Sequence, residues 1–122
     1  MMENTRPPGK TTIAPEVLLT IARLTTLDIK GVSRMSPLPG GVDRIFRRGA
    51  GDGVRIEIED NRVYADLYVI LDHNSNMRQV SRNIQQAVAR AISETVGMQV
   101  GRVNVHIEDI AYPALATTRE ID

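Results

Sequence analysis

The residues most able to do chemistry in this 122-residue sequence are two histidines, scattered carboxylates and serines, and one glycine-rich segment. His73 is expected in a loop and His106 on the polar face of a strand, so neither finds a second ligand at helical i, i+4 spacing. His106 shares its face with Glu108. The two residues are interpreted either as a weak divalent-cation site or as an ordinary surface pair, and we favour the surface pair. No serine lies in a Gly-x-Ser-x-Gly elbow, and no two carboxylates form an evident acid–base pair. Because the chain has no cysteine, thiol catalysis and zinc–thiolate sites are excluded. The sequence therefore predicts no catalytic residue, no metal site and no cofactor.

The glycine-rich segment at residues 49–53 invites comparison with a phosphate-binding loop. Such a loop must lead into a helix, whose N-terminal amides hold the anion. Here the glycines lead into a strand, and no Gly-Lys-Ser/Thr follows. We interpret the segment as a flexible lead into that strand.

Two tyrosines form the first candidate partner-binding surface. Tyr64 and Tyr68 alternate along one strand, so they are expected on one exposed line of an open sheet. Asp66, between them, is expected to be solvated. Tyrosine is favoured at interfaces because it buries area at little entropic cost; the alternative is that both residues merely fill a wet sheet face.

The second candidate surface is an arginine-rich loop that contains Arg44, Phe46, Arg47 and Arg48. Five arginines and two aspartates lie between residues 34 and 55, a local charge of +3 in a chain whose net charge is zero. This loop is suited to an acidic partner, a membrane surface or RNA. Alternatively, its apolar residues cap one end of the core.

Composition indicates an ordinary soluble domain. The chain is 42% hydrophobic and 25% charged, and no apolar run approaches the roughly 18–20 residues of a membrane span. No signal peptide is evident, so the cytoplasm is the expected compartment. Residues 1–10 are expected to be a disordered lead-in, 11–112 a single domain and 113–122 a flexible tail.

Hydrophobic periodicity predicts the helices and strands. A short strand is possible at Lys10–Ile13, and a helix is expected from Pro15 until Gly31 stops it. Its predicted apolar face comprises Val17, Leu18, Ile21, Leu24 and Leu27. A short strand at 32–36 and a loop at 37–53 follow, with one helical turn near 42–46. Strict alternation then predicts a hairpin, with strands at 54–59 and 63–71.

The second half of the domain is expected to hold a long helix and a final strand. Asn76 is a suitable N-cap with Gln79 three residues on, and an apolar stripe continues to Gly97. A last strand at 102–110 should return parallel to the strand at 63–71. The expected fold is an α+β two-layer sandwich: a mixed, mostly antiparallel sheet of about four strands with two main helices on one face.

The sequence resembles the bacterial alkaline shock protein family over residues 9–111. The matching positions are Ile13, Glu16, Val17, Gly31, Val32, Met35, Ser36, Gly53, Val54, Asp66, Leu67, Gly97, Val103, Asn104 and Val105. The chain departs from the family pattern at 73–74, where the family often has Tyr-Gly, and at 96–97, where it often has Thr-Gly. These are mostly fold residues, so the resemblance is specific for membership and says little about mechanism.

The resemblance implies a non-enzymatic cytoplasmic protein of the envelope stress response. It also implies self-association and a membrane-anchored protein partner that holds the chain beneath the membrane. The alternative hypothesis is a small RNA-binding module that stacks bases on Tyr64 and Tyr68 beside the arginine-rich loop. The neutral net charge and the lack of a Gly-x-x-Gly loop speak against nucleic acid, and an enzyme has no positive support.

Overall fold

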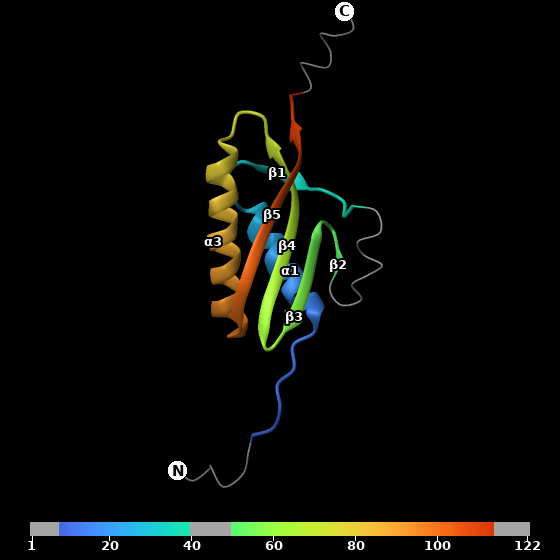
Figure 1. The fold of residues 1–122 in the computed structure, drawn as a ribbon, viewed down its shortest axis with the longest axis vertical. Coiled ribbons are helices and arrows are strands. Elements are labelled where there is room, and N and C mark those ends of the chain that lie inside the picture. Colours follow the sequence, from blue (N-terminus) through green and yellow to red (C-terminus); the bar gives the residue numbers. More distant parts are fainter. Residues whose placement is uncertain (1–7, 40–49, 114–122) are drawn as a thin grey trace, which may run out of the picture.

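The computed structural model describes residues 8–39 and 50–113, which form two helices packed on a five-stranded sheet (Figure 1). In chain order the elements are α1 (Pro15–Leu27), β1 (Val32–Met35), β2 (Ala50–Gly51), β3 (Val54–Glu59), β4 (Arg62–Asp72), α3 (Met77–Val96) and β5 (Gln99–Ala111).

The sheet is organised around β4. Along one edge β4 pairs in parallel with β5, from Arg62 to Asp72. The other edge is shared, because β3 pairs antiparallel with β4 up to Leu67 and β1 pairs antiparallel with it from Val69 onward. The hairpin and the parallel final strand are thus confirmed. The two-residue β2 beside β3 makes the sheet five strands rather than about four.

The two helices cover the same face of the sheet, as the sandwich requires. α1 lies behind the sheet in Figure 1, and α3 runs alongside β5. The core between the layers is aliphatic, in keeping with the low aromatic content. Its buried residues are Leu18, Ala22, Val54, Ile56, Val63, Ala65, Leu67, Val69, Leu71, Val80, Ile84, Val88, Ile92 and Val103.

The ends of α3 follow the sequence signals. The Asn76 side chain accepts a hydrogen bond from the backbone N–H of Gln79 at 3.0 Å, which satisfies one donor of the first turn. At the other end Gly97 adopts a left-handed conformation with φ of 76°, the usual helix stop. Both boundaries are therefore set locally, and the apolar stripe between them decides which face is buried.

α1 begins where Pro15 predicts, after Ala14, which makes no side-chain cap. The residues that it buries are Leu18, Ala22 and Thr26, one per turn. Thr26 is fully buried because its hydroxyl donates to the carbonyl oxygen of Ala22 at 2.7 Å, leaving no polar atom unsatisfied.

The predicted apolar face of α1 is consequently wrong in part. Val17, Leu24 and Leu27 are 44%, 54% and 39% exposed, since the buried line of the helix is rotated toward Ala22 and Thr26. The suggested strand at Lys10–Ile13 is also wrong, because these residues belong to no strand and β4 already has partners on both edges. Within the expected lead-in and tail, residues 1–7 and 114–122 lie outside the described residues, as does the predicted helical turn at 42–46.

Candidate functional site

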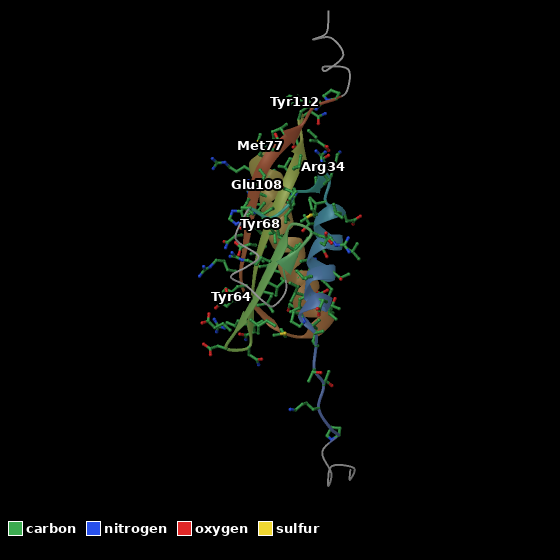
Figure 2. All side chains as sticks on the ribbon, turned by 90° about the vertical axis from the view of Figure 1, so that its right-hand side faces the viewer. Arg34, Tyr64, Tyr68, Met77, Glu108 and Tyr112 are labelled. Carbon is green, nitrogen blue, oxygen red and sulfur yellow. The ribbon has the colours of Figure 1, made fainter. Side chains whose placement is uncertain are left out.

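Tyr64 and Tyr68 both lie on the sheet face turned away from the helices, which we name the open face. Figure 2 shows them on the side opposite α1, together with Glu108. Their shared face follows from the alternation of β4, as expected. The expected exposure is not found for either residue. Tyr68 is only 7% exposed, whereas Tyr64 is half-buried.

Tyr68 is buried by its neighbours across the sheet. Its ring stacks on that of His106 in β5, with centroids 4.4 Å apart and planes inclined by 12°. Burial raises the pKa of the Tyr68 hydroxyl above its usual 10.0, with smaller contributions from the charges of Asp66 and Glu108, against a lowering effect of Arg55. Tyr68 is therefore part of the internal structure of the open face.

Tyr64 packs over the backbone of β5. A Cβ atom at Gly101 would come within 2.5–2.9 Å of three atoms at the end of the Tyr64 side chain, so only glycine leaves room for this side chain. The guanidinium carbon of Arg102 lies 5.6 Å from the ring centroid, within the range of a cation–π contact. One face of this ring is thus occupied, which makes Tyr64 a poor platform for an incoming base.

Asp66 lies at the centre of the open face and joins three strands. One carboxylate oxygen, Oδ2, accepts a hydrogen bond from Arg55 of β3 within an ion pair. The other, Oδ1, accepts from the amide of Asn104 at 3.1 Å and lies 2.9 Å from Nε2 of His106. The expectation that Asp66 is solvated is wrong, because these partners leave the residue only 8% exposed.

The electrostatics of this cluster follow from burial and hydrogen bonding. Burial alone would raise the pKa of Asp66, but hydrogen bonds from His106, Asn104 and Arg55, with the charge of Arg55, outweigh it and hold the pKa below 3.8. The carboxylate is therefore ionised and paired at neutral pH. Two of its three partners lie in β5, so the cluster fixes the parallel register of β4 and β5.

The cluster does not offer an evident catalytic or metal centre. Among residues 8–39 and 50–113, no three His, Asp or Glu side chains are grouped as metal ligands. His106 already contacts Asp66 through Nε2, and its ring stacks on that of Tyr68. The geometry buries the charged carboxylate of Asp66 together with its counter-charge, the guanidinium of Arg55.

Arg44, Phe46, Arg47 and Arg48 lie outside the described residues, so their predicted role stays a prediction. The glycine segment that follows them is partly visible. Gly53 has φ of 78°, and a Cβ there would lie 2.5 Å from the carbonyl oxygen of Ser36, so a side chain is excluded where β1 and β3 meet end to end along β4.

An apolar surface that the sequence pattern assigned to the core lies on α1. Val17, Leu24 and Leu27, which we name the α1 stripe, occupy one side of the helix at intervals of seven and three residues. Residues so spaced line up along a helix, and a row of exposed aliphatic side chains is typical of a binding surface. The same periodicity indicates a core or a docking surface, so sequence could find these residues but not their role.

A groove of about 740 Å³ continues this surface toward β1. Leu27 belongs to both the stripe and the groove, and Met35 and Leu38 supply further apolar lining. Arg23 and Arg34 supply the positive charges of the groove, and Asp52 lies 4.0 Å from Arg23. The stripe and the groove together suit an apolar segment that carries acidic groups.

Comparison with known proteins gives one family. A model of the alkaline shock protein 23 family, described as having a cell envelope-related function, matches residues 3–112. The uncharacterized protein Spy1535 of Streptococcus pyogenes serotype M6 is 32% identical over 103 residues, covering 84% of this chain and 79% of its own. The uncharacterized protein YqhY of Bacillus subtilis is 26% identical over 116 residues, covering 93% and 86%.

Among solved structures, MamM-CTD 215-293 aligns with a TM-score of 0.47 at 15% identity, covering 77% of this chain and 96% of the other. A likeness of this size bears on neither family nor function. Neither α1 nor α3 is long and apolar enough to cross a bilayer, judged over the described residues.

Proposed function

Since the chain belongs to the alkaline shock protein 23 family, which has a cell envelope-related function, we propose that it is a non-catalytic protein of the envelope stress response. In this proposal it acts in the cytoplasm by binding proteins. One partner is a membrane-anchored protein that holds it at the inner surface of the envelope, and another is a second copy of the chain.

The α1 stripe carries this proposal. Three large aliphatic side chains between 39% and 54% exposed lie on one helix side, and water contact with them is unfavourable by about 25 cal/mol per Å² of apolar surface. They run into the groove that Arg23 and Arg34 border. We propose that the occupant is an apolar segment with acidic flanks from the cytoplasmic part of the membrane-anchored partner.

The open face supports a non-catalytic role and speaks against the RNA alternative. Its central carboxylate, Asp66, is fully engaged by Arg55, Asn104 and His106. Two tyrosines are suggested for base stacking. Tyr68 is buried against His106, and the guanidinium of Arg102 lies over the ring of Tyr64. Little aromatic surface is left on this face for an unpaired base.

The test is capture of membrane proteins from a detergent extract, with and without nuclease, on the wild-type chain and on Leu24→Glu/Leu27→Glu. We expect the wild type to retain a protein with a membrane span after nuclease treatment and the double variant to lose it. Gln86→Glu, an exposed change on α3, is the matched control and should retain it.

Two outcomes would contradict the proposal. Capture unaffected by the double variant would remove the α1 stripe from the interaction, and loss of all bound material on nuclease treatment would favour RNA. Purified protein should also remain in the supernatant when sedimented with anionic liposomes. Strong co-sedimentation would indicate direct lipid binding instead of recruitment through a partner.

A further inference from the structure

A second groove lies where the second half of α3 meets the start of β5, at the lower end of both elements in Figure 1. Its volume is about 630 Å³, which is within the range of small-molecule sites. One wall consists of α3 residues at intervals of three or four, which share a side of the helix. The first residues of β4 and β5 form the other wall.

The polar lining of this groove consists of hydrogen-bond donors without an acid. Arg62 of β4 and Arg90 of α3 bring two guanidinium groups to it. Two amides and a hydroxyl complete the polar lining, those of Gln86, Gln99 and Ser93. Among the described residues no aspartate or glutamate lines the groove. Its local charge is therefore positive, and it favours an anion.

Both arginines have donors left for such an anion. Arg62 is exposed, and no ion pair joins it to another described residue. Arg90 forms an ion pair with Glu94 through its Nε atom at 3.2 Å, and both side chains stay largely exposed, at 77% and 68%. A guanidinium carries five N–H donors in a fixed fork, so this single hydrogen bond leaves most donors of Arg90 for another anion.

Glu94 itself shows that Arg90 holds a carboxylate. It lies in the last turn of α3, which ends at Val96, and the helix dipole disfavours a negative charge there. The other charged residues of α3 are all arginines, at positions 78, 82 and 90. Glu94 is thus an internal anion that competes for one donor of Arg90.

We propose that this groove binds a phosphate monoester, a small soluble molecule with an apolar group beside its phosphate. Guanidinium forks match pairs of phosphate oxygens. The donors come from α3, β4 and β5, and such a three-sided arrangement suits a tetrahedral group better than a planar carboxylate. The half-buried Ala89 and Val100 supply the apolar part of the lining. Because both arginines are exposed, we expect weak binding, in the millimolar range.

The test is a titration of the full chain with phenyl phosphate at constant ionic strength, followed through the backbone amide signals in NMR spectra. We expect saturable shifts at residues 86–93 and 99–100. Inorganic phosphate should shift the same signals with lower affinity, because it lacks the apolar group. Acetate should bind more weakly than either, and acetate binding as tight as that of phenyl phosphate would overturn the assignment to a phosphate.

Two variants remove the proposed ligands one at a time. Arg62→Gln and Arg90→Gln should each raise the dissociation constant of phenyl phosphate by about tenfold, as for the loss of one hydrogen bond to a charged group. Arg78→Gln removes the same charge from α3 outside the groove and should leave the constant unchanged. Unfolding midpoints equal to that of the wild type establish that the variants are folded. Wild-type affinity in Arg90→Gln would overturn the inference.

The competing carboxylate gives the decisive result. Glu94→Gln releases the Nε donor of Arg90, so phenyl phosphate should bind several-fold more tightly. Glu108→Gln, an exposed change near the other end of β5, makes the same change in net charge and should have no effect. Equal gains in the two variants would mean that net charge alone sets the affinity. That result, or no gain in Glu94→Gln, would overturn the inference.

A phosphate group at a membrane surface offers the same chemistry, and vesicles of phosphatidylcholine with phosphatidic acid distinguish the two sources. We expect the wild type to stay in the supernatant when sedimented with them. Vesicle binding that Arg62→Gln and Arg90→Gln abolish, without any binding of phenyl phosphate, would overturn the soluble ligand in favour of a lipid headgroup.

This inference goes beyond the proposed function and fails separately from it. The phosphate groove shares no lining residue with the α1 stripe or with the groove beside β1. Arg90→Gln should therefore still capture the membrane-anchored partner, and Leu24→Glu/Leu27→Glu should still bind phenyl phosphate.

Discussion

The Nε2 atom of His106 lies 2.9 Å from Oδ1 of Asp66, and the ring of the same histidine stacks on Tyr68. One side chain of β5 therefore contacts two residues of β4 that are separated by a single position. Because the second carboxylate oxygen binds Arg55 of β3, the polar centre of the open face links three strands.

Replacing Asp66 by Asn should destabilise the fold at neutral pH by about 1.5–3 kcal/mol, the range for hydrogen bonds to charged groups. Its pKa is held below 3.8 in the folded state, so the stabilisation is complete above that value. It is lost as the pH falls below 3.8 toward the folded-state pKa, because the unfolded chain binds the proton first. Urea unfolding of both proteins across this range should show the difference shrinking as the pH falls. Asp52→Asn, a control at an exposed position, should change the free energy of unfolding at neutral pH by less than about 0.5 kcal/mol.

Tyr68 should ionise only at a pH above 10.0, because burial raises its pKa above that usual value. A folded-state pKa above the unfolded value means that stability is complete below pH 10.0 and declines as the pH rises beyond it. Tyrosinate absorbance of the wild type should therefore contain a late step that Tyr68→Phe removes. A late step that survives in Tyr68→Phe would contradict the assignment.

Gly53→Ala should be among the most damaging single substitutions in the chain. The new Cβ would lie 2.5 Å from the backbone oxygen of Ser36, at a φ of 78°, and strained backbone alone costs about 1–3 kcal/mol. Gly97→Ala has a similar φ of 76° but meets nothing within 4 Å, so it isolates the conformational part. Denaturant unfolding should give a clearly lower free energy of unfolding for Gly53→Ala than for Gly97→Ala. Equal losses of stability in the two variants would contradict the backbone clash at Gly53.

Ile84→Ala should lower the free energy of unfolding by about 2–5 kcal/mol, as expected for a large aliphatic side chain removed from a packed core. Ile84 is 0% exposed beneath the sheet. Gln86→Ala, on the exposed side of the same helix, should change stability by less than about 0.5 kcal/mol. If Ile84→Ala lowered the free energy of unfolding by well under 1 kcal/mol, the described packing of α3 against the sheet would be contradicted.

The elements that sequence predicts best are those with local signals. Asn76 and Gly97 define the ends of α3, and strict alternation defines the hairpin of β3 and β4. Local signals do not determine which side of α1 is buried. Thr26 enters the core only because its hydroxyl bonds to the carbonyl of Ala22, and hydrophobicity gives no sign of this. The buried line of the helix is therefore rotated away from Leu24 and Leu27.

The candidate site shows the same limit. The alternation of β4 places Tyr64, Asp66 and Tyr68 on one face, and this is confirmed. The burial of Asp66 depends on Arg55, Asn104 and His106, which stand 11, 38 and 40 positions from it in the chain. No local pattern reports such partners, so a central buried carboxylate resembles a solvated one until the register of β5 is known.

The shared edge of β4 also determines how the native state opens. β4 has strand neighbours on both sides through most of its length, whereas β1 and β3 each hold only part of one edge. Partial unfolding that releases β1 leaves the hairpin and the parallel pair intact, while no partial opening frees β4 without separating at least two ladders. Amide hydrogens in the middle of β4 should therefore exchange with deuterium last, close to the rate set by global unfolding, and those of β1 much earlier.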